Sequence, residues 1–204
     1  MEKDKKIQRR KPKQARAEQK YNAILDASAR VLQAVGYRRA TMSEIHLESG
    51  YPYATIYQYF SNKEDIYLAW LERFMRNALL ELSDELQRAG ALDLNERIDL
   101  SVRFVLTQIV QHRPTVGRLL NGMSLVSSRL VEWLEDKSLE WIHLAFGPQV
   151  SEPHNAALLE KMLTATRVGN GYWLMLVLNT KREINIQTES QNVAALVKAL
   201  LFRA

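Results

Sequence analysis

Cysteine is absent from the 204 residues, which excludes disulfide bonds and thiolate metal sites. This absence fits a reducing compartment, so we expect a cytoplasmic protein. Glycine and proline are also scarce, at eight and five residues, and few stretches alternate apolar and polar residues as strands do. No apolar run approaches the roughly 18 residues of a membrane-spanning helix, and no apolar segment follows the basic N-terminus as in a signal peptide. These absences predict an all-α protein without a membrane partner.

Motifs for catalysis and metal binding are equally scarce in the sequence. The four histidines are scattered along the chain: His46, His112, His143 and His154. Glu140 and His143 have the Glu-x-x-His spacing of di-metal helical bundles, but the chain has no second copy. Gly122–Val126 begins like a nucleophile elbow, yet it lacks the second glycine and a preceding strand. We therefore expect no enzyme activity, no catalytic residue, no cofactor and no metal.

The net charge of +5 is concentrated at the N-terminus. Residues 1–20 hold nine of the 28 Lys and Arg residues but three of the 23 Asp and Glu residues, which leaves the rest of the chain with a net charge of −1. Residues 1–16 are polar and interrupted by Pro12, so we expect a flexible basic arm. This arm is either a solubilising tail or a segment that lies along DNA phosphates, where it steepens the salt dependence of binding.

The stretch Thr41–Phe60 has the pattern of two short helices joined by a tight turn. Thr41 and Glu44 have the spacing of a capping box, which starts a helix at Met42. Gly50 can adopt the left-handed conformation that ends a helix and turns the chain. Pro52 suits the first turn of the next helix, where its missing N–H costs nothing. A helix, a tight turn and a second helix form the motif that places a recognition helix in the DNA major groove.

These residues also carry a family resemblance. The run GYPYATIYQYFSNKEDI resembles the DNA-binding signature of the TetR/AcrR transcriptional regulators, and AILDASARVLQAVGYRRATMSEI is similar to the preceding two helices of that family. The resemblance implies a three-helix DNA-binding domain over residues 17–77, with its helix-turn-helix at about 40–59, and a larger C-terminal domain over 78–204 for ligand sensing and dimerisation. It implies a homodimeric repressor that binds a palindromic DNA operator and is released by a small, largely apolar effector.

Residue chemistry within the second helix suggests how DNA is read. Gln58 can pair with adenine, while Ala54 and Thr55 can contact thymine methyl groups. The hydroxyls of Tyr57 and Tyr59 suit phosphate oxygens. The full set of expected DNA-binding residues is Arg39, Thr41, Ser43, Tyr51, Tyr53, Ala54, Thr55, Tyr57, Gln58, Tyr59 and Lys63.

The resemblance also assigns roles to single residues of this region, and the role of two arginines stays open. The resemblance makes Thr41, Tyr57 and Lys63 phosphate contacts and puts Tyr53 at a base-reading position. Arg38 and Arg39 face either a phosphate or solvent. The chain departs from the family pattern at three places: Tyr51-Pro52 replaces the usual Val-Ser, Tyr59 a histidine, and His46 an alanine. These departures bear on the operator sequence and not on the fold.

Beyond residue 60, apolar periodicity predicts six more helices, about nine in all: 62–88, 95–112, a short 114–120 opened by Pro114, 123–146, 156–178 and 189–202. Large side chains and a few polar groups make candidate ligand contacts: Trp70, Phe74, Arg103, Phe104, Asn121, Met123, Asn170 and Trp173. Ordinary core packing is the alternative for each of them. The last two helices present more apolar surface than one subunit hides, so we expect a dimer interface that includes Leu158, Met162, Val193, Val197 and Leu200.

The sequence therefore predicts a sequence-specific, DNA-binding transcription regulator, with ligand-released repression as the leading hypothesis. The alternative is an activator or a nucleoid-associated protein of the same fold without small-molecule control. A protein whose basic arm docks on anionic membrane is a third possibility of a different class.

Overall fold

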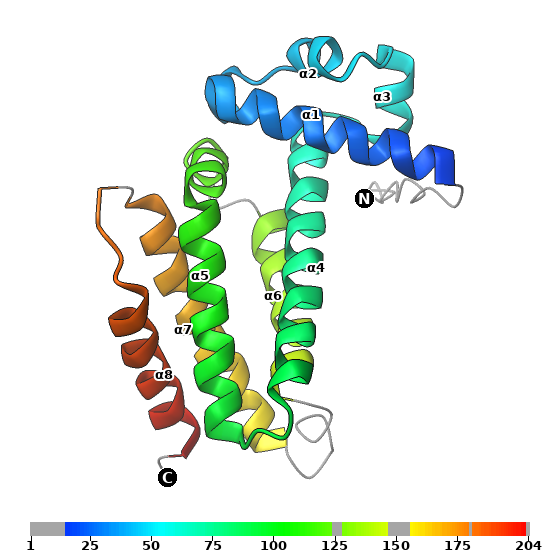
Figure 1. Ribbon diagram of the computed structural model, residues 1–204. Helices are drawn as coiled ribbons and strands as arrows, with labels where there is room; N and C mark the ends of the chain where they lie inside the picture. Colours follow the sequence, from blue (N-terminus) through cyan, green and yellow to red (C-terminus); the bar gives the residue numbers. More distant parts are fainter. Residues whose placement is uncertain (1–14, 124–127, 147–155, 180, 203–204) are drawn as a thin grey trace, which may run out of the picture. The chain divides into compact units, whose positions relative to one another are not determined.

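The computed structural model describes residues 15–123, 128–146, 156–179 and 181–202, and these form eight α-helices without a strand (Figure 1). The expectation of an all-α fold is confirmed. The chain divides into two compact units, and the division falls between Arg73 and Phe74, inside the fourth helix. Residues 1–14 of the predicted basic arm lie outside the described residues.

The first unit contains the predicted three-helix DNA-binding arrangement. Its helices are α1 (Ala15–Arg39), α2 (Met42–Ser49), α3 (Tyr53–Tyr59) and the first part of α4 (Lys63–Ala89). Every helix contributes a fully buried side chain to the core of this unit: Leu25 and Leu32 from α1, Ile45 from α2, Ile56 from α3, and Ile66 and Tyr67 from α4. The periodic apolar positions of the sequence are therefore the positions that pack together.

The ends of α1 and α2 follow local sequence signals. Gly36 has a φ of 75° and a ψ of 163°, which interrupts the regular geometry of α1 near its end. The Thr41 hydroxyl accepts from the Glu44 backbone N–H at 3.2 Å, and the Glu44 carboxylate accepts from the Thr41 N–H at 2.9 Å. Gly50 then closes α2 in the left-handed region with a φ of 69°. The predicted capping box and glycine turn are both confirmed.

Pro52 lies one position earlier than predicted. It is the N-cap of α3, with a φ of −57° and a ψ of 148°, so the helix begins at Tyr53. Its carbonyl accepts from the backbone N–H groups of Thr55 at 2.9 Å and Ile56 at 3.1 Å. The extended ψ turns this carbonyl toward the helix, and a proline at this position still has no N–H to leave unpaired.

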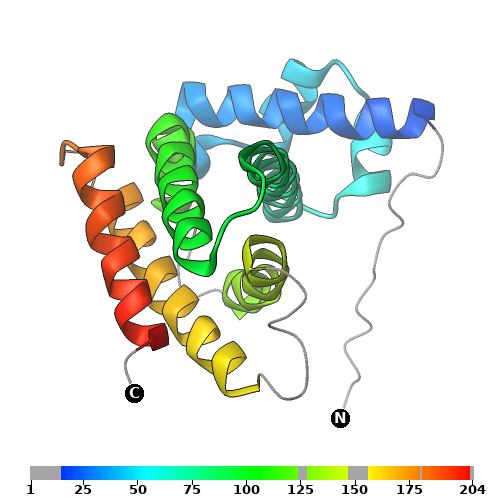
Figure 2. The ribbon, with the colours of Figure 1, turned by 60° about the horizontal axis from the view of Figure 1, so that its bottom comes forward.

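The second unit contains the rest of α4 and four long helices: α5 (Leu94–Leu120), α6 (Ser128–Phe146), α7 (Ala156–Leu178) and α8 (Ile186–Phe202). Helix α5 packs against α6, α7 and α8, and the views in Figures 1 and 2 agree that α5, α7 and α8 lie side by side. Two buried apolar clusters hold these helices together. One joins α4, α5 and α6 around Leu82 and Phe104, and the other joins α5, α6, α7 and α8 around Ile98 and Met162.

The separate helices predicted at 95–112 and 114–120 are one continuous helix, α5, with Pro114 in its interior. The described helices therefore number eight instead of about nine. Pro114 cannot donate the hydrogen bond expected at its position, but α5 continues past it, with buried residues on both sides, Leu106 before it and Leu119 after it. Parts of two further predictions, residues 124–127 of the helix at 123–146 and the loop at 147–155, lie outside the described residues.

Replacing Pro114 with alanine is expected to stabilise the protein. The substitution restores a backbone N–H inside α5, and we expect the free energy of unfolding to rise by about 1–2 kcal/mol after the lost rigidity of the unfolded chain is allowed for. Urea unfolding followed by circular dichroism measures this change. A loss of stability would mean that the native path of α5 depends on the proline.

Candidate DNA-binding site

One face of α3 is exposed and carries four of the predicted DNA-binding residues. Tyr53, Ala54, Tyr57 and Gln58 are all exposed, and the two tyrosines have 39% and 44% of their surface accessible. Their spacing of one, four and five positions places them on a single side of a helix. The exposed face therefore combines an amide, a methyl group and two phenols within two helical turns.

The opposite face of α3 packs onto α1. Ile56 is fully buried, and Tyr59 is half-buried with its ring set edge-on to Tyr21 at 5.8 Å between centroids. Phe60, directly after the helix, lies 5.0 Å from the same Tyr21 ring. Thr55 is also half-buried. The structure thus separates Thr55 and Tyr59 from the exposed face on which sequence reasoning had grouped them.

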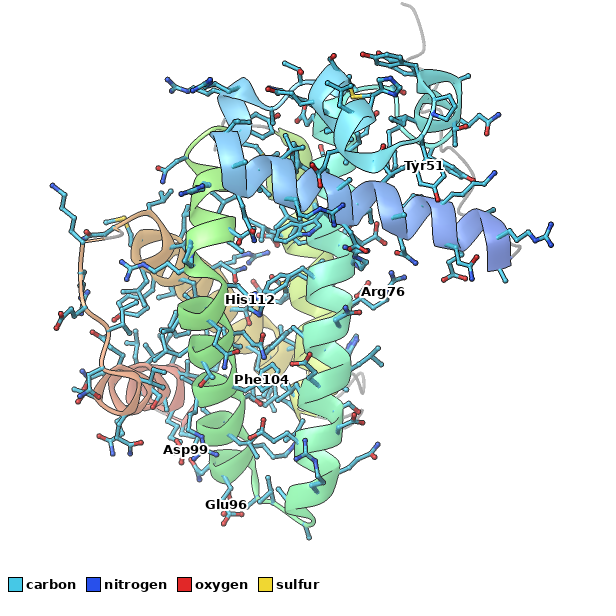
Figure 3. All side chains as sticks on the ribbon, turned by 45° about the horizontal axis from the view of Figure 1, so that its top comes forward. Tyr51, Arg76, Glu96, Asp99, Phe104 and His112 are labelled. Carbon is cyan, nitrogen blue, oxygen red and sulfur yellow. The ribbon has the colours of Figure 1, made fainter. Side chains whose placement is uncertain are left out.

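The turn between α2 and α3 is held by His46, a residue that sequence reasoning had noted only as a departure. Its Nδ1 lies 2.7 Å from the carbonyl oxygen of Tyr51, so this nitrogen carries the proton and donates it. The His46 ring stacks on Tyr53 at 4.3 Å, and Tyr53 in turn stacks on Tyr57 at 6.3 Å. Figure 3 marks Tyr51 in this turn. His46 therefore fixes both the turn and the first ring of the exposed face.

The start of α2 forms a second group of predicted contacts. Arg39, Thr41 and Ser43 are all exposed and lie within five residues of one another at this helix start. Thr41 is committed to the helix cap, and its hydroxyl also lies 3.2 Å from the Glu44 carboxylate. The remaining backbone N–H groups of the first turn suit an anion.

Lys63 is placed differently from a free surface lysine. Its Nζ donates to the carbonyl oxygens of Tyr37 at 2.9 Å and Ala40 at 3.0 Å, and it lies 4.5 Å above the centre of the Tyr37 ring. The ammonium thereby neutralises the carbonyl end of α1 and ties it to the start of α4. A phosphate contact by Lys63 stays a prediction, and such a phosphate would have to share an ammonium that already serves two carbonyls.

Further bonds fix α4 to α1 within the first unit. The buried Tyr67 hydroxyl donates to the Ser28 carbonyl at 3.1 Å, and burial raises the pKa of Tyr67 so that it remains a donor. Arg73 pairs with Asp26 at 2.5 Å and donates to the Asn22 carbonyl at 3.2 Å. The exposed face of α3 therefore belongs to a tightly connected helical body.

This body is electrically balanced. Residues 21–65 contain four bases (Arg30, Arg38, Arg39 and Lys63) and five acids. Arg30 is paired with Glu48 at 2.5 Å, and Lys63 is bound to carbonyls. The exposed Arg38 and Arg39 remain as positive groups beside the α2 start.

Residues 24–70 match the family model described as bacterial regulatory proteins of the tetR family. These residues of the chain form a TetR-family DNA-binding domain. It is 29% identical over 87 residues to the fatty acid metabolism regulator protein of Bacillus subtilis (strain 168), a match that spans 43% of this chain and 45% of that protein. The fatty acid degradation regulator FadR from Bacillus halodurans has the same fold, with a TM-score of 0.64 at 22% identity over 92% of this chain and 96% of that one.

A DNA-binding domain of this kind makes the chain a DNA-binding transcriptional regulator. In the described ranges, no helix is long and apolar enough to cross a membrane, and no three acidic, histidine or cysteine side chains are grouped as metal ligands.

The predicted ligand residues lie at several separate places. Trp70 is buried in the first unit, whereas the other seven lie in the second. Phe104 belongs to the buried cluster with α4 and lies 6.4 Å from Trp141, while Phe74 packs edge-on against His112 at 4.9 Å. Figure 3 labels Phe104 and His112 on α5. The remaining predicted positions differ in exposure: Met123 is buried, Asn170 and Trp173 are half-buried, and Arg103 and Asn121 are exposed.

A groove of about 350 Å³ lies between α7 and α8, and none of the eight predicted ligand residues lines it. Its wall includes Val193, Val197 and Leu200, three of the five residues predicted for the dimer interface. Leu158 instead packs against the second apolar cluster. Met162 is only 1% exposed, and this burial leaves it no surface to offer to a second copy.

One end of the groove is polar. Glu189 accepts hydrogen bonds from the Tyr172 hydroxyl and the Arg182 guanidinium, and all three residues line the groove. Burial and the bond to Glu189 raise the pKa of Tyr172, which keeps the phenol protonated as the donor.

Replacing His46 with alanine is expected to weaken binding to a selected operator about tenfold, because Tyr51 loses its donor and Tyr53 loses its stacking partner. Binding to unrelated DNA should change little, since phosphate attraction does not depend on this turn. Fluorescence anisotropy with both DNAs measures the two affinities. His143→Ala, which removes an exposed histidine in α6, is the matched control, and equal behaviour of the two variants would contradict the positioning role of His46.

Replacing Lys63 with methionine is expected to lower the free energy of unfolding by about 2 kcal/mol, because two carbonyls lose a charged donor. Urea unfolding of the variant measures this loss. Unchanged stability combined with weaker DNA binding would contradict the capping role and favour a direct phosphate contact.

Proposed function

We propose that this TetR-family regulator is a homodimeric repressor that binds a palindromic operator and leaves it when a small molecule binds. The exposed face of α3 is the observation that carries the proposal, because it presents base-reading groups on a helix whose other side is fixed to α1. The names of the two relatives suggest that the controlled genes serve fatty acid metabolism.

On this proposal, the face of α3 divides base reading from phosphate contact. Gln58 pairs with adenine, and Ala54 contacts a thymine methyl group. Tyr57 donates its hydroxyl to a phosphate, and Tyr53 lies where it contacts a base edge. Thr55 and Tyr59 support the helix from its half-buried side.

The start of α2 supplies the neighbouring phosphate contacts. A phosphate at the remaining backbone N–H groups of the first helical turn of α2 would be contacted by Arg39, Thr41 and Ser43. Tyr51, in the connection between α2 and α3, would contact the same phosphate. Because residues 21–65 have no excess of positive charge, long-range attraction comes mainly from the basic residues 1–16.

Dimerisation is supported by the apolar surface of α7 and α8. Val168 and Leu196 line the groove and are 46% and 50% exposed, and Met175 and Phe202 on the same helices are 68% and 50% exposed. An isologous contact would cover these side chains with the same surface of a second copy. Two copies related by a twofold axis would offer two α3 helices to successive major grooves.

Release by an effector requires a ligand that binds more tightly to the state in which the two α3 helices are wrongly spaced for DNA. An effector of this kind shifts the population away from operator binding without touching DNA. A small, largely apolar molecule fits the helical second unit and the relatives' association with fatty acids.

Two substitutions on the exposed face of α3 separate the assigned roles. Tyr57→Phe removes a phosphate donor and should weaken binding to all sequences by a similar factor. Gln58→Ala removes the base-pairing amide and should relax preference at one base pair, with about 1–3 kcal/mol less discrimination. Binding of each variant to an operator and its single-base mutants measures both effects. The reverse pattern would refute this assignment of roles.

A further inference from the structure

The second unit holds a half-buried arginine, two of whose donor atoms are buried and lack a hydrogen-bond partner among the described residues. Arg113, on α5, donates from Nη1 to the carbonyl oxygen of Arg182 at 2.7 Å. Its Nε and Nη2 atoms are buried and have no hydrogen-bond partner within residues 15–123, 128–146, 156–179 and 181–202. Buried donors are nearly always paired in proteins, and an uncompensated buried charge is costly. In the described part of the chain, no acceptor serves these two donors of the guanidinium, so both can bind an external acceptor.

The surroundings of Arg113 on α5 are apolar. The residues three and four positions away, which share its side of the helix, are Ile109, Val110, Val116 and Gly117. None of them carries an acceptor side chain. This side of α5 thus combines an unpaired cation with aliphatic surface.

A second buried donor without a partner lies on the helix that packs against α5. Trp133 belongs to α6, and its Nε1–H is buried without a hydrogen-bond partner among the residues that the structure describes. Arg113 lies seven residues before the end of α5 and Trp133 five residues after the start of α6. Both donors therefore lie within about two turns of the connection between these two helices.

We propose that Arg113 and Trp133 bind the anionic oxygens of an amphipathic effector, a carboxylate or a phosphate, while the aliphatic surface of α5 receives its apolar part. A guanidinium presents its donors in a fork that fits two oxygens of such a group. This inference rests on the proposed function, since it names the ligand class that releases the regulator.

The same arginine is connected to the groove between α7 and α8. Its Nη1 holds the backbone of Arg182, whose side chain binds Glu189, which also accepts from Tyr172. Arg182, Glu189 and Tyr172 form the polar end of the groove proposed as the dimer interface. An anion that reorients the Arg113 guanidinium would weaken its bond to Arg182 and so change the surface through which two copies meet.

Calorimetric titration of the full chain with dodecanoate, dodecyl phosphate and dodecanol tests the site, and the first two probes distinguish a carboxylate from a phosphate. We expect at least one of the anions to bind and dodecanol to bind more weakly. Arg113→Met should lower the affinity for that anion about 10-fold to 100-fold, because charged hydrogen bonds are lost. Arg118→Met, which removes an exposed arginine of the same helix, should bind like the wild type.

Two further readouts separate a binding role from a structural one. Without ligand, Arg113→Met should unfold at the same temperature as the wild type or higher, since it removes an uncompensated buried charge. Trp133→Phe keeps an aromatic ring but lacks the N–H, and it should bind the anion several-fold more weakly. Trp133→Phe therefore still tests the site if Arg113→Met does not fold.

The proposal is overturned if neither anion binds the wild type, or if Arg113→Met and Trp133→Phe both bind as the wild type does. Operator affinity measured with and without the bound anion keeps the two proposals apart. If the anion binds through Arg113 but leaves the operator complex intact, the anion site is supported and release by an effector is refuted. Release that is undiminished in Arg113→Met would refute the site and leave effector release standing.

Discussion

The packing of α3 on α1 is the constraint on which the DNA-binding site depends. A helix of seven residues is too short to be stable by itself. It keeps its shape because Ile56, Tyr59 and Phe60 are held against α1, with Tyr21 between the last two rings. His46 fixes the entry to the helix from the other side. The four exposed residues of α3 are thus presented on a rigid base, and DNA binding need not order them first.

The electrical balance of residues 21–65 separates attraction from recognition. Three bases of the first unit are paired within the protein: Arg30 with Glu48, Arg73 with Asp26, and Lys63 with the end of α1. A charge that is paired within the protein stabilises the helical body and adds little to the electrostatic potential at the DNA-binding surface. Recognition on the proposed account therefore depends on the fit of the α3 face, while salt-sensitive attraction belongs to the basic residues 1–16.

Sequence reasoning succeeded where the cause is local. The Thr41 capping box and the left-handed Gly50 depend on residues within a few positions, so their spacing was enough to predict them. It failed where the cause is tertiary. Lys63 caps a helix end 26 residues earlier, Arg113 holds a carbonyl 69 residues later, and Pro114 is carried through α5 by burial on both sides. Periodicity found the apolar face of α3 but could not assign Tyr59 to the side that packs on Tyr21.

The central claim is that two copies of the α3 face read two half-sites of one operator. Sequencing the DNA that the purified protein selects from a random library tests this most directly. The account predicts an inverted pair of half-sites whose centres lie about 10 base pairs, or a multiple of that, apart. Selection of a single unrepeated site, or of DNA without any common motif, would contradict it.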